Sequence, residues 1–264
     1  MADNKIKIED LINVLNKYND AVIILGDRTD NTKINYNIFN RRTMIKTPKL
    51  FWKFYKKEIF DKYMAIKNDE KEQNVNKLIE EGIAKLIINT RCEGSFNNIR
   101  NILLRGDINE LKCLSCNKKY STKTEEELDT IIAPVMTEEG KEILKCECGG
   151  KISPTILTET DAYNEDFIKE IKDAIFKEDK DGLVELNTHA LILIDVDTEE
   201  DYISELIESF NSIKNNNNID KENNEKSFLV MICEKDGLNI EAFKPEFATY
   251  EDINNSIIRL THIL

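Results

Sequence analysis

Four cysteines in two close pairs are the residues of this 264-residue chain whose type and spacing point most directly to chemistry. Two residues separate Cys113 from Cys116, and one residue separates Cys146 from Cys148. Two tight pairs of thiolates are the ligand set of a tetrahedral structural zinc ion, and four thiolates leave no open position for catalysis. A segment this small has little core of its own, so zinc would supply most of its folding free energy. We therefore predict a structural zinc site at these four cysteines, with reduced, unligated thiols as the alternative.

The overall composition is that of a soluble globular protein. The hydrophobic content is 41%, the charged content is 33% and the formal net charge is −13. A surface with this charge repels phosphate backbones, so nucleic acid is not expected as a partner. No apolar run reaches the roughly 20 residues of a membrane span, and the N-terminus lacks the pattern of a secretory signal. We expect a cytoplasmic protein without a membrane partner, whose cysteines are not disulfide-bonded. A protein or peptide partner remains open, as does the oligomeric state.

Short apolar runs alternate with helical patterns along most of the chain. The apolar runs lie at 21–26, 85–88, 189–197 and 226–235, and amphipathic or aromatic helical patterns separate them. Buried strands that alternate with helices are typical of an α/β fold with a parallel sheet. The cysteine segment interrupts this pattern, which indicates an insertion that is stabilised by its own structural zinc ion.

We therefore predict a Rossmann-type parallel sheet with an inserted small lobe made of helices and a zinc ribbon. The large lobe would comprise residues 1–38, 82–110 and 155–264. The helical part of the small lobe would comprise residues 39–81, and the zinc ribbon residues 111–154.

A family resemblance rests on two stretches of the sequence. One is CLSCNKKYS followed by CECGGKISP, and the other is TPKLFWKFYKKEIF, in which a proline precedes an aromatic helix. Together with the order of the elements, they resemble the sirtuin family of NAD-dependent protein deacylases. The resemblance implies a sirtuin-like fold, with NAD bound between the lobes and an acylated peptide as substrate.

The first NAD-binding motif of that family is only partly present. Sirtuins carry Gly-Ala-Gly-x-Ser after the first strand, and glycine lets the backbone approach the diphosphate. This chain has Gly26, Asp27, Arg28, Thr29 and Asp30 there. Gly26 and Arg28 are therefore the only cofactor-binding candidates, in a degenerate loop, and NAD is a doubtful cofactor.

The catalytic motif of the family is a His-Gly pair that follows Glu-Leu, just before the zinc segment. Here Glu110-Leu111 leads directly to Lys112 and the first cysteine, and the two histidines, His189 and His262, lie elsewhere. An imidazole suits a general base because its pKa lies near neutrality, and lysine does not. We therefore assign no catalytic residue.

Four further motifs of the family are also changed. The stretch INTRCEGSF stands in place of Thr-Gln-Asn-Ile-Asp, with Asn89 or Thr90 as shifted matches, and TILTETD stands in place of Phe-Gly-Glu. Asp195, Val196 and Asp197 replace Gly-Thr-Ser, and Cys233 replaces an asparagine. The pattern predicts a sirtuin-like pseudoenzyme that acts as a binding or scaffold module. A divergent NAD-dependent deacylase, or an ADP-ribose-handling enzyme of the same type, is the alternative.

Two other chemistries remain open from the residues alone. Carboxylates follow strands at Asp27, Asp30, Asp195 and Asp197, so they could gather at one sheet edge and hold a cation. The favoured reading is that they cap helices and turns. A Cys-His dyad of Cys92 with His189 is the weaker possibility.

Overall fold

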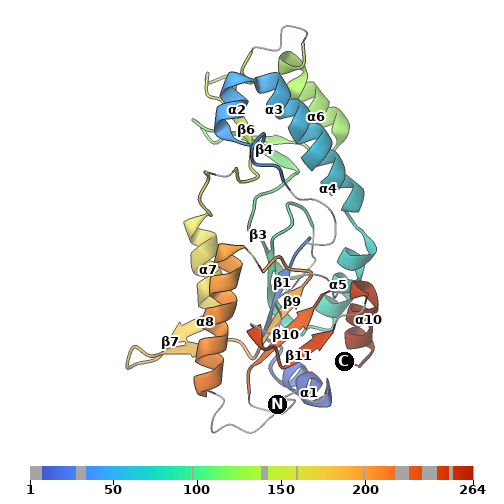
Figure 1. Cartoon of the computed structure of the whole chain (residues 1–264), viewed down its shortest axis with the longest axis vertical. Coiled ribbons are helices and arrows are strands. Elements are labelled where there is room, and N and C mark those ends of the chain that lie inside the picture. The colour runs from blue at the N-terminus through green and yellow to red at the C-terminus, as the bar shows by residue number, and fades with distance from the viewer. Residues whose placement is uncertain are drawn as a thin grey trace.

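The computed structural model describes residues 8–27, 34–94, 96, 98–137, 142–158, 160–198, 200–217, 226–233, 243–249 and 252–263. The molecule is elongated, with a large lobe built on a parallel sheet at one end and a small lobe at the other (Figure 1). The chain passes between the lobes at the carboxyl ends of the central strands, so the sheet edge that could bind a ligand faces the small lobe.

The large lobe contains a six-stranded sheet in which every pairing is parallel. Its order is β11-β10-β9-β1-β2-β3. The strands are β1 (Ala21–Leu25), β2 (Ala84–Asn89), β3 (Arg100–Leu103), β9 (Ala190–Ile194), β10 (Phe228–Ile232) and β11 (Phe247–Thr249). β1, β9 and β10 are buried along their whole length, because helices cover both faces of a parallel sheet and leave no polar side.

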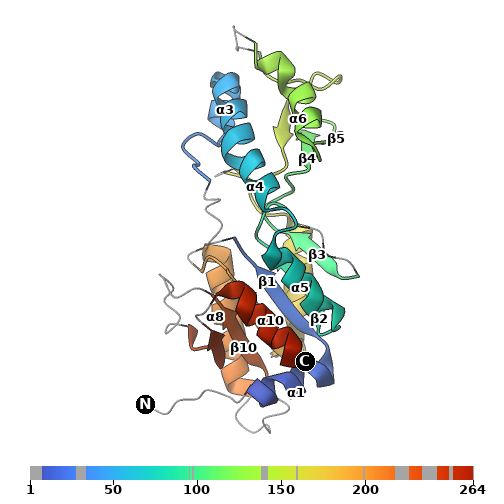
Figure 2. The same cartoon turned by 90° about the vertical axis from the view of Figure 1, so that its right-hand side faces the viewer.

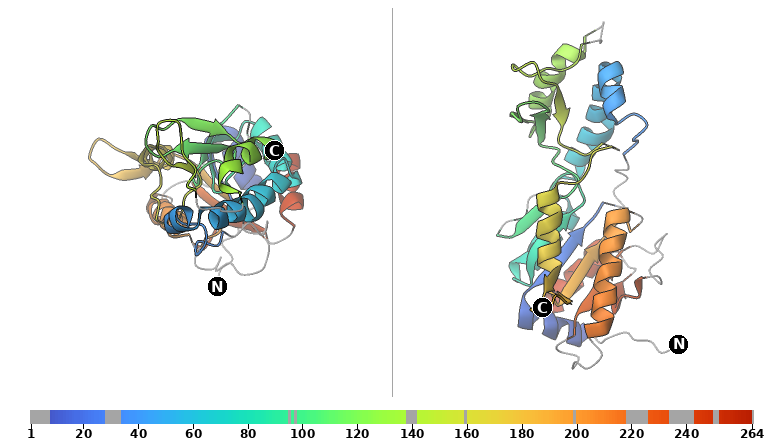
Figure 3. Two further views of the ribbon diagram at one scale, coloured as in Figure 1. Left: turned by 90° about the horizontal axis from the view of Figure 1, so that it is seen from above. Right: turned by 90° about the vertical axis from the view of Figure 1, so that its left-hand side faces the viewer.

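Helices cover the two faces of this sheet. On one face lie α1 (Ile8–Tyr18), α5 (Glu70–Glu80) and α10 (Ile253–Ile263), which are nearest the viewer in Figure 2. On the other face lie α7 (Glu165–Ile175) and α8 (Asp201–Asn217), which are nearest the viewer in the right-hand panel of Figure 3. Alternate residues of β1 take part in separate cores: Ile23 joins the first and Ile24 the second.

The small lobe has an aromatic core of its own. Its helices are α2 (Arg41–Lys46), α3 (Pro48–Phe54), a π-helical turn (Tyr55–Phe60), α4 (Asp61–Ile66) and α6 (Glu125–Ile132), followed by a 3-10 turn (Ala133–Val135). Trp52 is fully buried, and its ring lies edge-on to Phe51 and Tyr55 at centroid distances of 5.4 and 5.6 Å. Beside these helices, β4 (Glu110–Cys113), β5 (Lys119–Ser121) and β6 (Ile152–Pro154) form an antiparallel sheet.

Two further elements complete the described part of the chain. β7 (Phe176–Glu178) and β8 (Val184–Leu186) form a hairpin that projects from the large lobe (Figure 1). None of the helices in the described ranges is both long and apolar enough to cross a membrane. The predicted α/β architecture with an inserted cysteine-bearing lobe is confirmed, whereas the exact lobe boundaries stay a prediction.

Candidate functional site

The order of the strands places the expected ligand crevice between β1 and β9. From β1 the chain continues to β2 and β3 on one side and later to β9, β10 and β11 on the other. Ligands of open α/β sheets bind at such a switch point, outside the carboxyl ends of the strands. Here the two loops touch, because the Gly26 amide donates to the carbonyl of Ile194 at 2.9 Å. A Cβ on Gly26 would lie 2.3 Å from the carbonyl oxygen of Asp195, so only glycine fits.

A buried ion pair holds the loop after β9. Lys71 of α5 donates to the carboxylate of Asp195 at 2.7 Å, and the two side chains are 6% and 0% exposed. Asp195 also has a φ of 53°, a backbone conformation that suits glycine and is tolerated by aspartate. The Asp195 backbone is therefore in the left-handed region, and its side chain is engaged in a buried charged pair.

The loop after β1 is also fixed by side chains from other elements. The Tyr63 hydroxyl, from α4 in the small lobe, donates to the buried carboxylate of Asp27 at 2.5 Å. Arg105, which follows β3, lies 3.8 Å from the other oxygen of Asp27 and 2.6 Å from Glu200. Burial alone would lower the pKa of Arg105, but the carboxylates of Glu200 and Asp27 hold it above its ordinary value. Arg105 is therefore a permanent cation between the lobes.

Hydrogen bonds and side-chain contacts within the loop after β2 fix its conformation. Asn89 donates to the carbonyl of Glu93 at 2.8 Å and accepts from the amide of Arg91 at 2.9 Å. The guanidinium of Arg91 contacts the carboxyl group of Glu93, and both side chains are fully buried. Burial raises the pKa of Glu93 to about 8, although Arg91 opposes the shift. Asn89, the shifted match proposed for the family's amide, therefore stabilises a turn.

Arg105 and Gly106 give a second match to the family's catalytic motif. We compared the family's His-Gly with the residues after Glu110-Leu111, but that stretch lies within β4, inside the small lobe. The stretch Leu104-Arg105-Gly106 directly follows β3 at the sheet edge, and it differs from Leu-His-Gly only at the central residue. Gly106 has a φ of 98°, and a Cβ there would lie 2.3 Å from the carbonyl oxygen of Thr155. A Leu-x-Gly triplet after an apolar run was the sequence signal that could have found this position.

A cavity of about 520 Å³ opens beside Arg105. Three tyrosines line it: Tyr36 from the segment before α2, Tyr163 from the segment before α7, and Tyr202 from the first turn of α8. The rings of Tyr163 and Tyr202 lie 5.5 Å apart with an angle of 44° between their planes.

Four carboxylates line the same cavity: Asp161, Asp197, Glu200 and Asp201. Asp161 accepts two hydrogen bonds from one nitrogen of Arg41, at 2.8 and 3.0 Å, and a third from its Nε at 3.2 Å. Glu200 is paired with Arg105 and also accepts from the Tyr163 hydroxyl. The cavity therefore has an aromatic and predominantly anionic wall.

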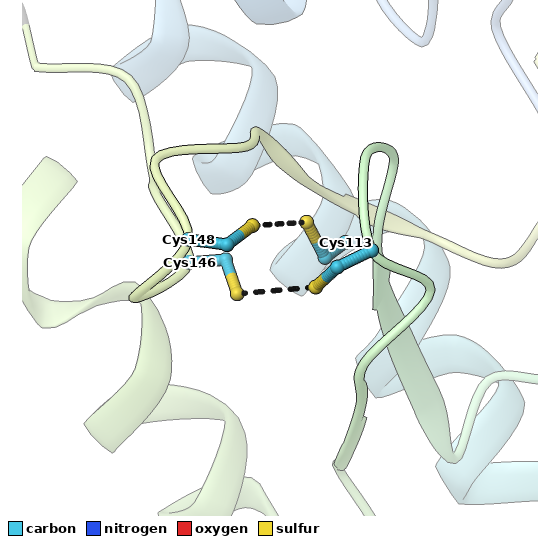
Figure 4. Close-up of side chains that lie close together, drawn as sticks. Cys113, Cys146 and Cys148 are labelled. Carbon is cyan, nitrogen blue, oxygen red and sulfur yellow. Dashed lines mark hydrogen bonds between the residues drawn. The ribbon is translucent and has the colours of Figure 1, made fainter.

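The four cysteines predicted as zinc ligands converge in the small lobe (Figure 4). Their sulfurs lie within 4.8 Å of one another, with Cys113 to Cys148 at 3.5 Å and Cys116 to Cys146 at 3.7 Å. Four sulfurs placed about 2.3 Å from a central zinc would lie about 3.8 Å apart, so the residues fit the ion. Within the described ranges, no other group of three or more histidine, cysteine or acidic side chains is placed to hold a metal.

The electrostatics of this cluster call for a cation. A hydrogen bond from Tyr120 lowers the pKa of the Cys146 thiol to about 6, and backbone amides lower that of Cys113. The amide of Gly150 also lowers the pKa of Cys148, but the other three sulfurs outweigh it and raise that pKa to about 12. The sulfurs therefore share a proton through hydrogen bonds, and a divalent cation would take the place of that proton among four thiolates.

The structure places Cys92 and His189, the two residues of the hypothetical Cys-His dyad, at opposite edges of the sheet. Cys92 follows β2 at the carboxyl edge, whereas His189 precedes β9 at the opposite edge of the parallel sheet. The ring of His189 stacks on Tyr18 at 3.5 Å, and its Nδ1 lies 2.9 Å from Asp20. The proposed Cys-His dyad is therefore wrong.

The carboxylate hypothesis has a mixed outcome. Asp27, Asp195 and Asp197 do follow strands at one edge, but Asp27 and Asp195 are paired with cations of the chain itself. The acidic residue at 30 and the cofactor candidate Arg28 lie outside the described residues.

Comparison with solved structures identifies the architecture. The chain matches Sir2Tm bound to a propionylated peptide with a TM-score of 0.69, at 16% identity and over 98% of both chains. The chain has the Sir2 fold. It also matches a Sir2 homologue in complex with NAD with a TM-score of 0.71, at 14% identity, over 97% of this chain and 93% of that one. The predicted sirtuin resemblance is confirmed for the fold.

Sequence comparison gives a shorter match. An NAD-dependent protein deacetylase of Sulfolobus acidocaldarius is 28% identical over 115 residues, which are 42% of each chain. No protein-family model matches the chain. The aligned part therefore spans less than half of that relative.

Proposed function

We propose that this chain is a zinc-stabilised Sir2-fold binding module that does not perform NAD-dependent deacylation. The observation that carries the proposal is the buried Lys71–Asp195 pair, which fills the sheet edge where the family's motif has Gly-Thr-Ser. A diphosphate needs backbone amides and small side chains at this edge. The carboxylate of Asp195 repels a diphosphate. Lys71 is paired with Asp195, so its charge is not available to a diphosphate.

Arg105 supports the same proposal from the catalytic side. A general base must lose a proton near the working pH, and a guanidinium whose pKa is raised further cannot do so. The zinc ion proposed at Cys113, Cys116, Cys146 and Cys148 would hold β4 and β6 together through their cysteine-bearing loops. It would serve stability only, because four thiolates leave no coordination position for a substrate.

A divergent NAD-dependent deacylase is the second candidate function. It is favoured by the match to the Sulfolobus NAD-dependent protein deacetylase and by the retained Gly26 and Gly106. In this case the carboxyl edge of the six-stranded sheet rearranges when NAD binds, and a group other than Arg105 acts as the general base.

Calorimetric titration of the zinc-loaded chain with NAD, and separately with ADP-ribose, tests the proposal. We expect neither heat nor thermal stabilisation at millimolar ligand. An Arg105→His variant, which restores an imidazole at this position, should also fail to turn over NAD with an acetylated peptide. One-site NAD binding with turnover by the wild type would overturn the proposal and establish the second candidate.

A further inference from the structure

The hairpin of β7 and β8 presents an apolar side chain to solvent at its tip. It projects from the large lobe between the end of α7 and the start of β9, so it lies at the amino edge of the parallel sheet (Figure 1). The carboxylate of Asp179 accepts hydrogen bonds from the amides of Asp181 and Leu183, each at 2.8 Å, which fixes the turn. Leu183 is 66% exposed, the largest exposed fraction among the large hydrophobic side chains of the described residues.

A groove of about 720 Å³ lies at the base of this hairpin, between the end of α7 and the second half of α8. Its apolar lining consists of Phe176 from β7, Val184 from β8 and Ile213 from α8. Val184 is 47% exposed, and Phe176 and Ile213 are half-buried. The groove and the tip therefore both leave apolar surface in water, and covering that surface is favourable.

The charged groups at the two ends of the hairpin complement each other. At the base, Lys172 and Asp173 line the groove, and at the tip Lys180 and Asp181 stand in the turn. All four side chains are exposed, and none of them forms an ion pair within the described part of the chain. If two hairpins lie side by side in opposite directions, Asp181 of one copy meets Lys172 of the other. Lys180 then meets Asp173 in the same way.

The charge of the whole chain singles out this face for self-association. A net charge of −13 makes two copies repel each other over most of their surface. The remaining charged side chains of the groove, Lys177 and Glu178, also have opposite signs, so the lining is neutral overall. Two copies can therefore approach here without the general repulsion, whereas a basic partner would find no net charge in the groove.

From these observations we infer that the β7–β8 hairpin is a dimerisation arm. Two copies of this chain pair about a two-fold axis, and the tip of each hairpin, with Leu183, covers the groove of the other copy. In such an interface every contact occurs twice, so the apolar burial and the ion pairs are both doubled. The inference is independent of the proposed function, because the arm lies at the amino edge of the sheet and the ligand crevice at the carboxyl edge.

Sedimentation velocity of the zinc-loaded chain tests the arm. A contact made by one hairpin and one groove belongs to the small interfaces, below about 1,200 Å², so we expect a reversible dimer that forms with rising concentration. Leu183→Ser should raise the dissociation constant of the dimer at least about 10-fold, because a buried leucine is lost from both copies. Leu50→Ser provides the matched control. Leu50 is also exposed, at 50%, but lies on α3 of the small lobe, so its loss should change the constant less than about 2-fold.

Two charge variants test the pairing of tip with base. Asp181→Lys places a lysine against Lys172 of the other copy, and Lys172→Asp places an aspartate against Asp181. Each variant alone should dimerise at least about 10-fold more weakly than the wild type, because like charges meet at both contacts. An equimolar mixture of the two should dimerise within about 3-fold of the wild type, since both contacts of the mixed dimer again join opposite charges. High salt should reduce the difference between the mixture and the separate variants.

Three results would overturn the inference. They are a monomer up to millimolar concentration, equal effects of Leu183→Ser and Leu50→Ser, and a mixture of the charge variants that dimerises no better than either variant alone. All four variants change exposed side chains, and melting curves confirm that each is folded. None of these measurements involves NAD, so a failure of the dimerisation arm is distinguishable from a failure of the proposed function.

Discussion

Removing the amine of Lys71 tests whether the sheet edge is held by a buried charge pair. In Lys71→Met most of the unbranched apolar stem is kept, but the carboxylate of Asp195, which is 0% exposed, loses an ammonium group 2.7 Å away. Breaking a buried ion pair from one side costs about 3–5 kcal/mol, because the remaining charge is left uncompensated. For a chain of this size each kcal/mol lowers Tm by about 2–4 °C, so we expect a drop of about 6–20 °C.

A double-mutant cycle separates the pair from other effects of the substitution. Asp195→Asn keeps a residue that tolerates the φ of 53° and removes the charge. Lys71→Met with Asp195→Asn should therefore cost less than Lys71→Met alone, with a coupling energy of at least about 2 kcal/mol. The free energies of unfolding come from urea titrations followed by circular dichroism.

The exposed pair of Arg100 and Glu170 provides the control. Its atoms are also close, at 2.6 Å, but its side chains are 52% and 37% exposed. Arg100→Met should cost no more than about 1 kcal/mol, because solvent screens the pair. If Lys71→Met costs as little as this control, or if the double variant costs the sum of the single ones, the reasoning about the sheet edge is refuted.

Three further perturbations have expected outcomes. Cys116→Ser, or chelation, should remove one zinc ion per chain. Hydrogen-exchange protection should then be lost in the three-stranded sheet and kept in the six-stranded sheet. Retained protection of the three-stranded sheet without metal would contradict the structural role of zinc. Burial raises the pKa of Glu93 from 4.5 to about 8, so its stabilising contribution is complete below pH 4.5 and is lost as pH rises toward 8. Glu93→Gln should therefore flatten the decline of urea midpoints over this window, and an unchanged slope would assign the decline to other groups. Gly106→Ala places a Cβ 2.3 Å from the carbonyl oxygen of Thr155. It should therefore lower the free energy of unfolding by at least about 1–3 kcal/mol more than Gly82→Ala, where φ is also positive but no atom lies within 4 Å. Equal shifts of the urea midpoints would show that the contact at Gly106 relaxes.

The central strands of the fold could be predicted because they are buried on both faces. β1, β9 and β10 are continuous apolar runs, and such runs indicate a parallel sheet that helices cover on both sides. The edge strands were missed. β3 has one buried residue among its four, and β11 has none among its three, so neither carries a hydrophobic pattern.

The candidate site could be predicted only where the residues follow strands or share a short spacing. The four cysteines converge as their spacing predicts, and Asp27 and Asp195 follow strands that end at one edge. Their partners could not be found in the same way. Lys71 lies 124 residues from Asp195 in the sequence, and Tyr63 lies 36 residues from Asp27. Only the tertiary structure, which places α4 and α5 beside these loops, brings the side chains together.

One electrostatic property connects the sheet edge with the cavity. Among the described residues, six carboxylates lie there, namely Asp27, Asp161, Asp195, Asp197, Glu200 and Asp201, together with the cations Arg41, Lys71 and Arg105. A dinucleotide brings two negative phosphates into such a region, where burial strengthens their repulsion. We therefore expect this edge of the sheet to disfavour a dinucleotide, as the proposed function requires.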